Sequence, residues 1–480
     1  MGKLNESFEY KGFWWLPETP DVDIPGILRF TPDNGIFLEL QGVLHGGDDH
    51  LFHPPIFKDE SLILGVTSQG KEVSLINCVQ IKGIVGAGWN YLATPETAYH
   101  ITRAYVDVRF PSIEEVEFDE FMVDYTHLDE WMDQNPFQFD RRGISEISLM
   151  YKAPEVIRVN YEGYNISFMV SGPVTKRPSI GKITISQDVR VKIACIVGNK
   201  NQEDFSLIIR RMQDFLTLGV GEAVFPKDIE ASCSANKQVL DNGRVYKPPV
   251  QVYYALPWRP KLSRKIHSGE MIFSLKTIND RIGFYLTNWF TKSEELKPVL
   301  DIYFSMLYRE NIYSEFRFLG LAQAIETYHR RKYDGKYQED DEYLSGMYSQ
   351  FLKCLPLDLD KSFRQSLIEG KLRYAHEYSL RKRLTDLTRH FGNNLPFRFL
   401  IIPNERNKFI DDVCNTRNYF THYNQLLSSK AAKTGQELYE LSNKIRALLD
   451  ALLLEEIGFE RIQIGAMIRK NGYYSNLIEQ

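Results

Sequence analysis

The spacing of apolar residues changes once along this chain, between about residues 285 and 290. Before this point apolar and polar residues alternate in short runs, and after it apolar residues recur every three or four positions. A period of two is typical of strands, and a period near 3.6 is typical of amphipathic helices. The pattern therefore predicts an α+β multidomain protein. Residues 1–285 form an all-β region with a sandwich or barrel-like fold and room for two subdomains, and residues 290–470 form an all-α bundle.

Within the first region, two apolar runs at 26–30 and 36–40 flank a turn rich in Pro, Asn and Gly, which predicts a β-hairpin. The other predicted strands are 12–17, 61–66, 73–79, 99–110, 117–125, 155–161, 164–170, 182–197 (a two-strand element), 250–255 and 271–275. Many short strands at this spacing favour a sandwich or a partly closed barrel over an α/β sheet. Residues 204–218 predict one long amphipathic helix, and 129–133 predict a short exposed one.

The second region predicts a series of amphipathic helices joined by short polar loops. These helices are 294–309, 314–333, 343–354, 361–368, 378–391, 404–422, 436–458 and 459–469. Helices of this length with one apolar stripe each must bury that stripe against one another, so an all-α bundle is expected.

Composition excludes several classes of protein. The 480 residues are 43% hydrophobic and 25% charged, which is typical of a globular protein. A formal net charge of −5 argues against a protein that coats nucleic acid by bulk electrostatics, although local basic patches remain open. The five cysteines form no CxxC pair, so neither a zinc site nor a disulfide framework is indicated. No apolar run approaches the length of a membrane span, and we expect a cytoplasmic protein.

Two loops in the first region resemble ligand sites only weakly. His45, His50 and His53 lie near two aspartates and could form a metal loop, but a solvated loop accounts for them equally well. The glycine-rich segment 83–89 lacks a phosphate-loop lysine and leads to no predicted helix. We therefore expect no metal and no cofactor.

The most informative stretch is 414–423, near the end of the predicted helix 404–422. It contains Arg417, Asn418 and His422. Asn418 and His422 are separated by four positions and share a helix face, whereas Arg417 lies about 140° away from His422 around the axis. Either the arginine reaches around, or the helix loosens, or the partner histidine comes from another chain. As a bare pattern, an arginine and a histidine at this spacing occur by chance in many helices.

Two clusters of basic residues accompany this stretch. They are His329, Arg330, Arg331 and Lys332 beside Glu326 on a helix end expected to be exposed, and Arg381, Lys382 and Arg383 on helix 378–391. A basic cluster on a helix is ordinarily a solvated face. Next to a histidine and arginine pair, the two clusters are also candidates for a groove that follows a phosphate backbone.

The combination resembles the HEPN superfamily, in its ApeA-like anti-phage branch. The motif 417–422 (RNYFTH) within a C-terminal bundle carries the resemblance, with the helix 318–331 and the N-terminal segments 12–17, 24–28 and 38–42, which are similar to the ApeA N-terminal β domain. The resemblance implies that the protein is a ribonuclease that halts phage propagation by abortive infection. RNA is the implied substrate, with tRNA as a candidate, and a phage-encoded trigger or antagonist is the implied partner. The β-rich region would be the sensor, the regulator or an assembly platform.

The residue types fit RNA cleavage without a metal, since the 2′-hydroxyl of RNA is itself a nucleophile. His422 can move protons near neutral pH, and Arg417 can neutralise the phosphorane. Asn418 can orient the imidazole or bind phosphate, and Glu326 can hold Arg417 or His422. We expect a 2′,3′-cyclic phosphate product. The motif supplies one histidine per chain, and together with the 140° offset this predicts a homodimer with a composite site. The competing hypothesis is a non-enzymatic module that recognises a phage protein or glycan and dimerises through the bundle.

Overall fold

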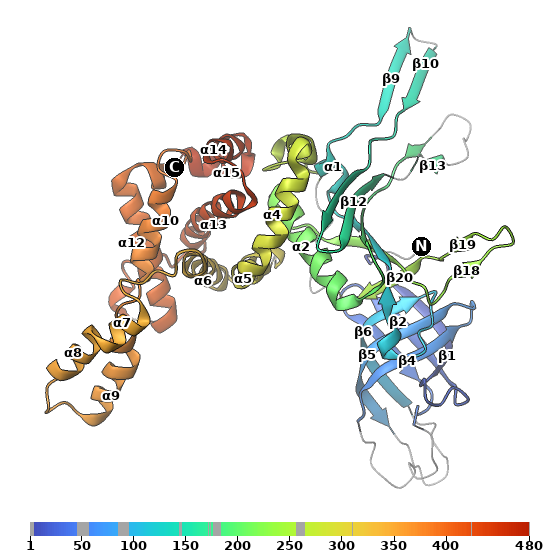
Figure 1. The fold of residues 1–480 in the computed structure, drawn as a ribbon, viewed down its shortest axis with the longest axis horizontal. Helices are drawn as coiled ribbons and strands as arrows, with labels where there is room; N and C mark the ends of the chain where they lie inside the picture. Colours follow the sequence, from blue (N-terminus) through green and yellow to red (C-terminus); the bar gives the residue numbers. More distant parts are fainter. Residues whose placement is uncertain are drawn as a thin grey trace. The chain divides into compact units, whose positions relative to one another are not determined.

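A computed structural model describes residues 4–45, 57–84, 96–143, 146–170, 172, 174–175, 184–255, 265–309, 311–423 and 425–479. The chain divides into two compact units, Met1–Thr287 and Asn288–Gln480. The first is rich in strands and the second is helical (Figure 1), so the predicted fold class is confirmed. Each unit is described below by itself.

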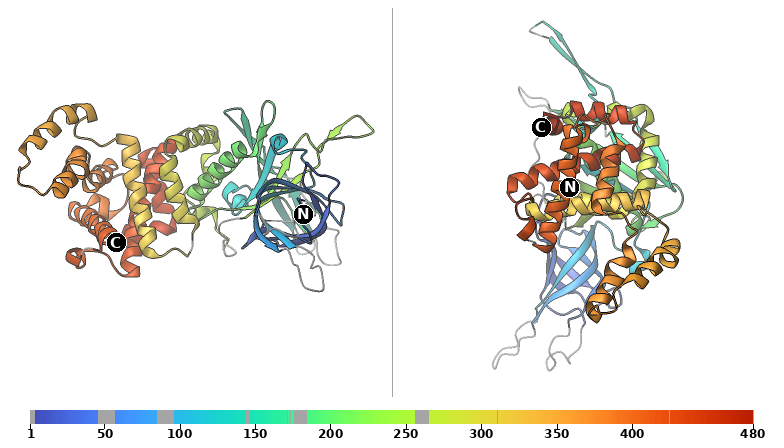
Figure 2. Two further views of the ribbon diagram at one scale, coloured as in Figure 1. Left: turned by 90° about the horizontal axis from the view of Figure 1, so that it is seen from below. Right: turned by 90° about the vertical axis from the view of Figure 1, so that its left-hand side faces the viewer.

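The N-terminal part of the first unit is a closed antiparallel barrel. Its strands are β1 (Phe8–Trp15), β2 (Ile24–Thr31), β3 (Gly35–Leu40), β4 (Glu60–Thr67), β5 (Glu72–Ile84) and β6 (Glu96–Val106). They run in the order β6-β3-β2-β1-β4-β5, and pairing of β5 with β6 closes the ring, drawn in blue in Figure 2. The predicted hairpin is confirmed as β2 and β3, joined at Gly35 with φ of 86°. Inward-facing side chains such as Trp14, Leu28 and Leu38 are fully buried and form the barrel core.

The sheet continues beyond β6 into a second layer that supports one long helix. The added strands are β20 (Val250–Tyr254), β17 (Pro226–Ser232), β8 (Glu120–Tyr125), β15 (Val189–Cys195), β12 (Tyr164–Val170) and β11 (Ile157–Tyr161). Helix α2 (Gln202–Val220) begins at Asn201, whose side chain accepts a hydrogen bond from the backbone N–H of Asp204. The helix packs on this layer, where the Tyr125 hydroxyl donates to the Ile209 carbonyl at 2.9 Å.

Small two-stranded ribbons complete the first unit. They pair β9 (Phe137–Arg142) with β10 (Glu146–Tyr151), β13 (Val174–Thr175) with β14 (Ile185–Ser186), β7 (Glu117–Phe118) with β16 (Lys200–Asn201), and β18 (Gln238–Val239) with β19 (Val245–Tyr246). The ribbon of β9 and β10 extends away from the rest of the first unit in Figure 1. The alternation of apolar and polar residues predicted neither this ribbon nor strand β17.

Two predictions for the first unit are wrong, and both fail because tertiary contacts outweigh the local pattern. Residues 271–275 form no strand, because the backbone N–H groups of Ile272 and Phe273 both donate to the Gly219 carbonyl at the end of α2. The chain then enters α3 (Leu275–Ile278). Helix α1 (Leu128–Met132) was expected to be exposed, but Trp131 is fully buried and packs against the ring of Phe215.

The second unit is a bundle of helices. They are α4 (Ile282–Glu295, which begins in the first unit), α5 (Lys297–Tyr308), α6 (Ser314–Tyr333), α7 (Asp340–Ser345), α8 (Met347–Cys354), α9 (Lys361–Gly370), α10 (Leu380–His390), α11 (Arg398–Ile401), α12 (Pro403–His422), α13 (Gly435–Ile457), α14 (Arg461–Lys470) and α15 (Gly472–Glu479). The bounds of α6 agree with the prediction. The predicted helix 294–309 is instead divided at Leu296, because Pro298 lies in the first turn of α5 and lacks a backbone N–H.

Helix α6 packs against both α5 and α13, and most residues of α13 are buried. The buried carboxylate of Asp450 on α13 accepts hydrogen bonds from the hydroxyls of Tyr303 and Tyr474, and Arg446 lies 3.5 Å away. Burial of these hydroxyls beside the carboxylate raises the pKa of both tyrosines well above the usual value. Both hydroxyls therefore remain protonated donors, and they join α5 and α15 to the centre of the bundle.

Candidate active site

Helix α12 carries the Arg417, Asn418 and His422 motif in its last two turns. The helix begins with Pro403 at its first position, where a missing N–H has no cost. It ends after His422, and Tyr423 caps it in the left-handed conformation with φ of 47°. Since α12 remains α-helical through His422, the helix does not loosen within the motif. One of the three geometric alternatives from the sequence is thereby removed.

The Arg417 side chain is directed along the helix surface toward its neighbour. Its Nη1 donates to Asn418 Oδ1 at 3.3 Å. Asn418 and His422 are both exposed and, four positions apart, share one face of α12. Within the described part of the chain, the His422 ring makes no hydrogen bond or ion pair. The guanidinium therefore lies beside the face that presents a free imidazole to solvent.

Two threonines fix the backbone on either side of Arg417. The Thr421 hydroxyl donates to the Arg417 carbonyl at 2.7 Å. Thr416 is fully buried, and its hydroxyl accepts a hydrogen bond from the backbone N–H of Ala432 at 2.9 Å. The second bond ties the segment that follows α12 back to the residue before Arg417. No local pattern predicts this contact, because Thr416 and Ala432 are 16 residues apart.

Charged groups from three helices surround the buried thiol of Cys414. Burial raises the pKa of Cys414 to about 11, the charges of Arg381 and Arg417 lower it, and those of Asp411 and Glu326 raise it. Arg381 on α10 and Asp411 on α12 form an ion pair at 2.5 Å. Glu326, Arg381 and Arg417 are thus close enough to Cys414 for their charges to act on its thiol. Because its pKa is about 11, Cys414 is a neutral thiol near pH 7.

Glu326 does not contact the motif directly. Its carboxylate lies 3.4 Å from the guanidinium of Arg330, one turn further along α6, and Arg330 pairs in turn with Glu377 at 2.5 Å. Among the described residues, no hydrogen bond or ion pair joins Glu326 to Arg417 or His422. Any influence of Glu326 on the motif therefore acts through its charge.

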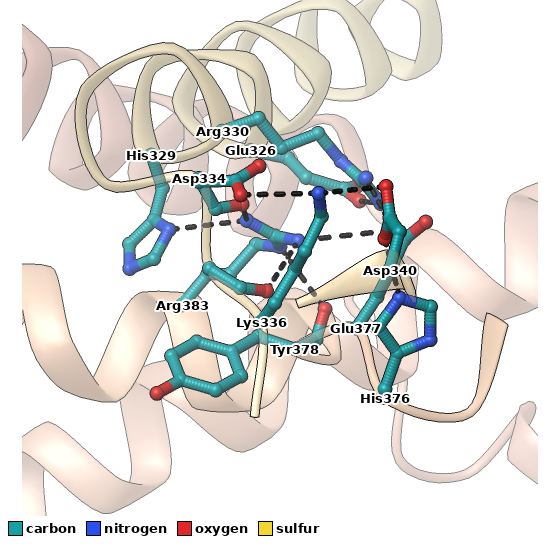
Figure 3. A network of polar contacts seen from close by, with 11 residues as sticks. Glu326, His329, Arg330, Asp334, Lys336, Asp340, His376, Glu377, Tyr378 and Arg383 are labelled. Carbon is teal, nitrogen blue, oxygen red and sulfur yellow. Dashed lines mark hydrogen bonds and ion pairs between the residues drawn. The ribbon is translucent and has the colours of Figure 1, made fainter. Parts of the chain in front are cut away.

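His329 and Arg383, which were expected among the phosphate-binding residues, lie inside the bundle (Figure 3). Arg383 donates to the carbonyls of Tyr378, Asp334 and Gly335 at 3.0, 3.1 and 3.2 Å. Its Nη1 also lies 3.1 Å from His329 Nδ1. Burial, and then the charge of Arg383, lower the pKa of His329 to about 4. His329 is therefore neutral and accepts this hydrogen bond.

The expected exposure of His329 and Arg383 is wrong, and neither can reach a phosphate backbone from this position. The periodicity of the two helices explains why both side chains are buried. His329 follows the buried Ala322 and Ile325 by seven and four positions, and Arg383 precedes the buried Leu387 by four. Both side chains therefore belong to the apolar stripes of their helices. Helix periodicity is thus the signal in the sequence for these two positions, but it does not reveal the three carbonyls that accept hydrogen bonds from Arg383.

The other members of the two basic clusters remain at the surface. Arg331 is exposed and makes no ion pair with any described residue. Lys332 lies 2.8 Å from Glu456, and Lys382 lies 2.7 Å from Asp386. The pair of Lys382 is at the surface and can exchange with other anions, whereas the Glu456 side chain is almost buried. Arg381 pairs with Asp411, so Arg331 is the cation of these clusters most open to a ligand.

The other ligand sites considered from the sequence find no counterpart among the described residues. No group of three or more His, Cys, Asp or Glu side chains there is arranged to hold a metal ion. His45 pairs with Glu60, whereas His50 and His53 lie outside the described residues. Gly83 belongs to strand β5, and residues 85–89 of the glycine-rich segment are also outside them. None of the described helices is both long and apolar enough to span a membrane.

Comparison with protein families assigns both parts of the chain. The family model of ApeA N-terminal domain 1 matches residues 9–289, and that of the Apea-like HEPN domain matches residues 319–463. Comparisons with curated proteins and with solved structures give no significant match. The HEPN match includes α6, α10 and α12, which carry the site described above. The chain therefore belongs to the ApeA family of anti-phage HEPN proteins, and its function is of the nuclease type.

Proposed function

We propose that this protein is an anti-phage endoribonuclease that cleaves RNA without a metal ion and is activated on infection. The observation that carries this proposal is the end of α12, where Arg417 lies against Asn418 and the exposed His422 shares the face of Asn418. A permanent positive charge and an exposed imidazole are the kinds of group that RNA cleavage by the 2′-hydroxyl uses.

In the proposed reaction, His422 removes the proton from a 2′-hydroxyl, whose oxygen then attacks the adjacent phosphorus. The P–O bond to the 5′ oxygen breaks, and this oxygen receives a proton and leaves. The products are a 2′,3′-cyclic phosphate and a 5′-hydroxyl. Arg417 binds the non-bridging oxygens as negative charge accumulates on them, because its guanidinium stays protonated and offers paired donors. Asn418 contacts the same phosphate or orients the imidazole.

We further propose that two chains form the catalytic site. The reaction needs both a base and an acid, and the motif of each chain supplies one histidine. Two copies of α12 that face one another across a two-fold axis would supply both. Because Arg417 is directed toward Asn418 in a single chain, each copy would contribute an arginine as well as a histidine.

Exposed cations near the motif are the proposed contacts with the RNA backbone. Arg331, Arg381, Arg330, Lys332 and Lys382 remain candidates, whereas His329 and Arg383 are withdrawn because they are buried. The candidate substrate is tRNA. The ApeA N-terminal domain would sense a phage-encoded trigger and restrain the nuclease until infection.

Purified protein tests the proposal directly. Wild type is incubated with total tRNA and with mixed-sequence RNA in the presence of EDTA, and the new RNA ends are analysed chemically. We expect cyclic phosphate ends, and a loss of rate of at least about 100-fold for His422→Ala and Arg417→Ala. Lys408→Ala is the matched control, since Lys408 is an exposed cation on the same helix, away from the motif. Full activity of His422→Ala would refute the assignment.

Mixing experiments test the shared site. If each site needs histidines from both chains, equal amounts of wild type and His422→Ala leave only about a quarter of dimers with two intact chains. Activity should then fall to about a quarter after subunit exchange. A fall to one half, as for simple dilution, would show that each chain acts alone.

A further inference from the structure

An arm formed by residues 340–374 projects from the helical unit between α6 and α10, and its base is held firmly (Figure 1). The N–H of Tyr337 donates to the carbonyl of His376 at 2.8 Å, which joins the chain before the arm to the chain after it. Tyr343 in the arm is buried and stacks on the ring of His376, with the ring centroids 4.2 Å apart. His376 Nε2 also lies 2.7 Å from Asp340 Oδ1. The base therefore fixes the direction in which the arm leaves the bundle.

The outer part of the arm, in contrast, leaves its apolar side chains uncovered. Helices α8, of eight residues, and α9, of ten residues, are described in full, and neither of them has a buried residue. Phe363 on α9 is 53% exposed, Leu357 between the helices is 94% exposed, and Met347 and Phe351 on α8 are exposed as well. Isolated helices shorter than about 12–15 residues are marginally stable in water. The arm therefore needs another surface against its apolar side chains.

Charged side chains of both signs lie among these apolar ones and lack an opposite charge. In the part of the chain that the structure describes, the ion pairs of the arm all involve Asp340 at its base. The exposed residues without an ion pair include three cations and three carboxylates, namely Lys353, Lys361, Lys371, Asp358, Asp360 and Glu369. RNA or an anionic membrane surface would be repelled by the carboxylates. A contact that places one surface on an identical surface instead needs both signs, because a surface of a single sign repels its own copy.

We propose that the arm docks on the arm of a second copy of this chain, across a two-fold axis. The arm is large enough for this contact, since a stable interface uses about 20–30 residues of each partner. A phage-encoded protein is absent before infection, whereas a second copy is present whenever the chain is made. The cover that the two short helices need is therefore always available.

The arm contact is separate from the proposed shared site, because the arm contains no residue of the Arg417, Asn418 and His422 motif. If α12 joins two chains as proposed, the arms join two such pairs into a larger assembly. The inference about the arm does not depend on RNA cleavage.

Mass photometry of the full-length protein tests the inference. The double variant Leu357→Asp/Phe363→Asp places two carboxylates where the second arm would cover apolar side chains, whereas Leu357→Met/Phe363→Leu keeps both positions apolar. Ile462→Asp is the matched control, because Ile462 is 75% exposed on α14, outside the arm. Circular dichroism checks that each variant is folded. We expect the aspartate variant to have half the mass of the wild-type assembly, because burial of two unpaired carboxylates weakens the contact far more than about tenfold. The apolar variant and the control should keep the wild-type mass.

Cross-linking identifies the surfaces that meet. Cys354 is exposed at the end of α8. Because α8 is only about 12 Å long, two Cys354 thiols across the contact lie within reach of a long flexible bismaleimide. We expect a cross-linked dimer that is lost in Cys354→Ser and in Leu357→Asp/Phe363→Asp.

Three outcomes would overturn the arm contact: a monomeric wild type, an aspartate variant with the wild-type mass, or the absence of a cross-link that depends on Cys354. A wild type that cleaves no RNA but has twice the mass of the aspartate variant would refute the proposed function and leave the arm contact standing. A wild type that cleaves RNA in an assembly unaffected by the arm substitutions would do the reverse.

Discussion

Replacement of Arg383 by methionine should destabilise the helical unit, and this variant separates a structural role of the buried cation from a role in RNA binding. Methionine fills a similar space but donates no hydrogen bond. The carbonyls of Tyr378, Asp334 and Gly335 and the ring nitrogen of His329 would each lose a donor. An unsatisfied buried polar group costs about 1–3 kcal/mol, and partial entry of water offsets some of this, so we expect a net loss of about 3–5 kcal/mol.

Differential scanning calorimetry and hydrogen exchange measure this loss. At about 2–4 °C per kcal/mol for a unit of this size, the transition of the helical unit should fall by roughly 10 °C. A chain of two units need not melt in one step, so a local readout is also needed. The amides of Tyr337 and Tyr378 serve this purpose. They donate to the carbonyls of His376 and Gly335, both at 2.8 Å, beside Arg383, and their exchange should become faster.

The neighbouring substitution Lys382→Met provides the control. Lys382 is partly exposed, and among the described residues its ammonium group pairs only with Asp386 on its own helix and with the face of Tyr378, so its loss should cost less than about 0.5 kcal/mol. If Arg383→Met leaves the transition temperature and the exchange rates unchanged but weakens RNA binding, the structural role is refuted. The direct phosphate contact expected from the sequence would then be restored.

Three further predictions concern the supports of the same site. The pKa of His329 is about 4 in the folded protein, below its ordinary value near 6.5, so neutral His329 contributes stability above pH 6.5 that is lost as the pH falls toward 4, by up to about 3 kcal/mol. His329→Gln should flatten this part of the pH profile of the unfolding free energy measured with urea. A profile parallel to that of the wild type would contradict this prediction. Thr416→Val removes the acceptor of the Ala432 N–H and should cost about 1–2 kcal/mol and lower the cleavage rate, whereas Thr416→Ser should retain both. In Gly335→Ala the added Cβ would lie 2.3 Å from Arg383 Nη1 at a φ of 76°, so we expect a loss of at least about 2 kcal/mol, and an unchanged melting temperature would refute this.

The sequence was most informative where a structural feature depends on residues a few positions apart. The hairpin of β2 and β3 and the extent of α6 follow from local alternation, turn residues and helix periodicity. The spacing of Asn418 and His422 fixes their common face once α12 is helical. The resemblance to the ApeA family was likewise contained in short segments, and the family comparison confirms it.

Local patterns failed where distant groups compete for the same residues. Residues 271–275 have the composition of a strand, but two of their N–H groups bond to the end of α2. Lys332 was placed correctly at the surface, while His329, three positions earlier on the same helix, was not. Periodicity alone would have placed His329 inside, but the burial of a histidine is acceptable only because a hydrogen-bond donor is present.

The amino-acid sequence by itself determined the two-part architecture, the helix that carries the motif and the family to which the chain belongs. Only the tertiary structure decided that β5 and β6 close the barrel, that Arg417 is directed toward Asn418, and that Thr416 holds the segment after α12. It also decided that Arg383 serves the core and not the surface. Arg383 and His329 are 54 residues apart, and a buried cation is stable only where folding brings acceptors around it. That coincidence of distant groups has no local signature in the chain.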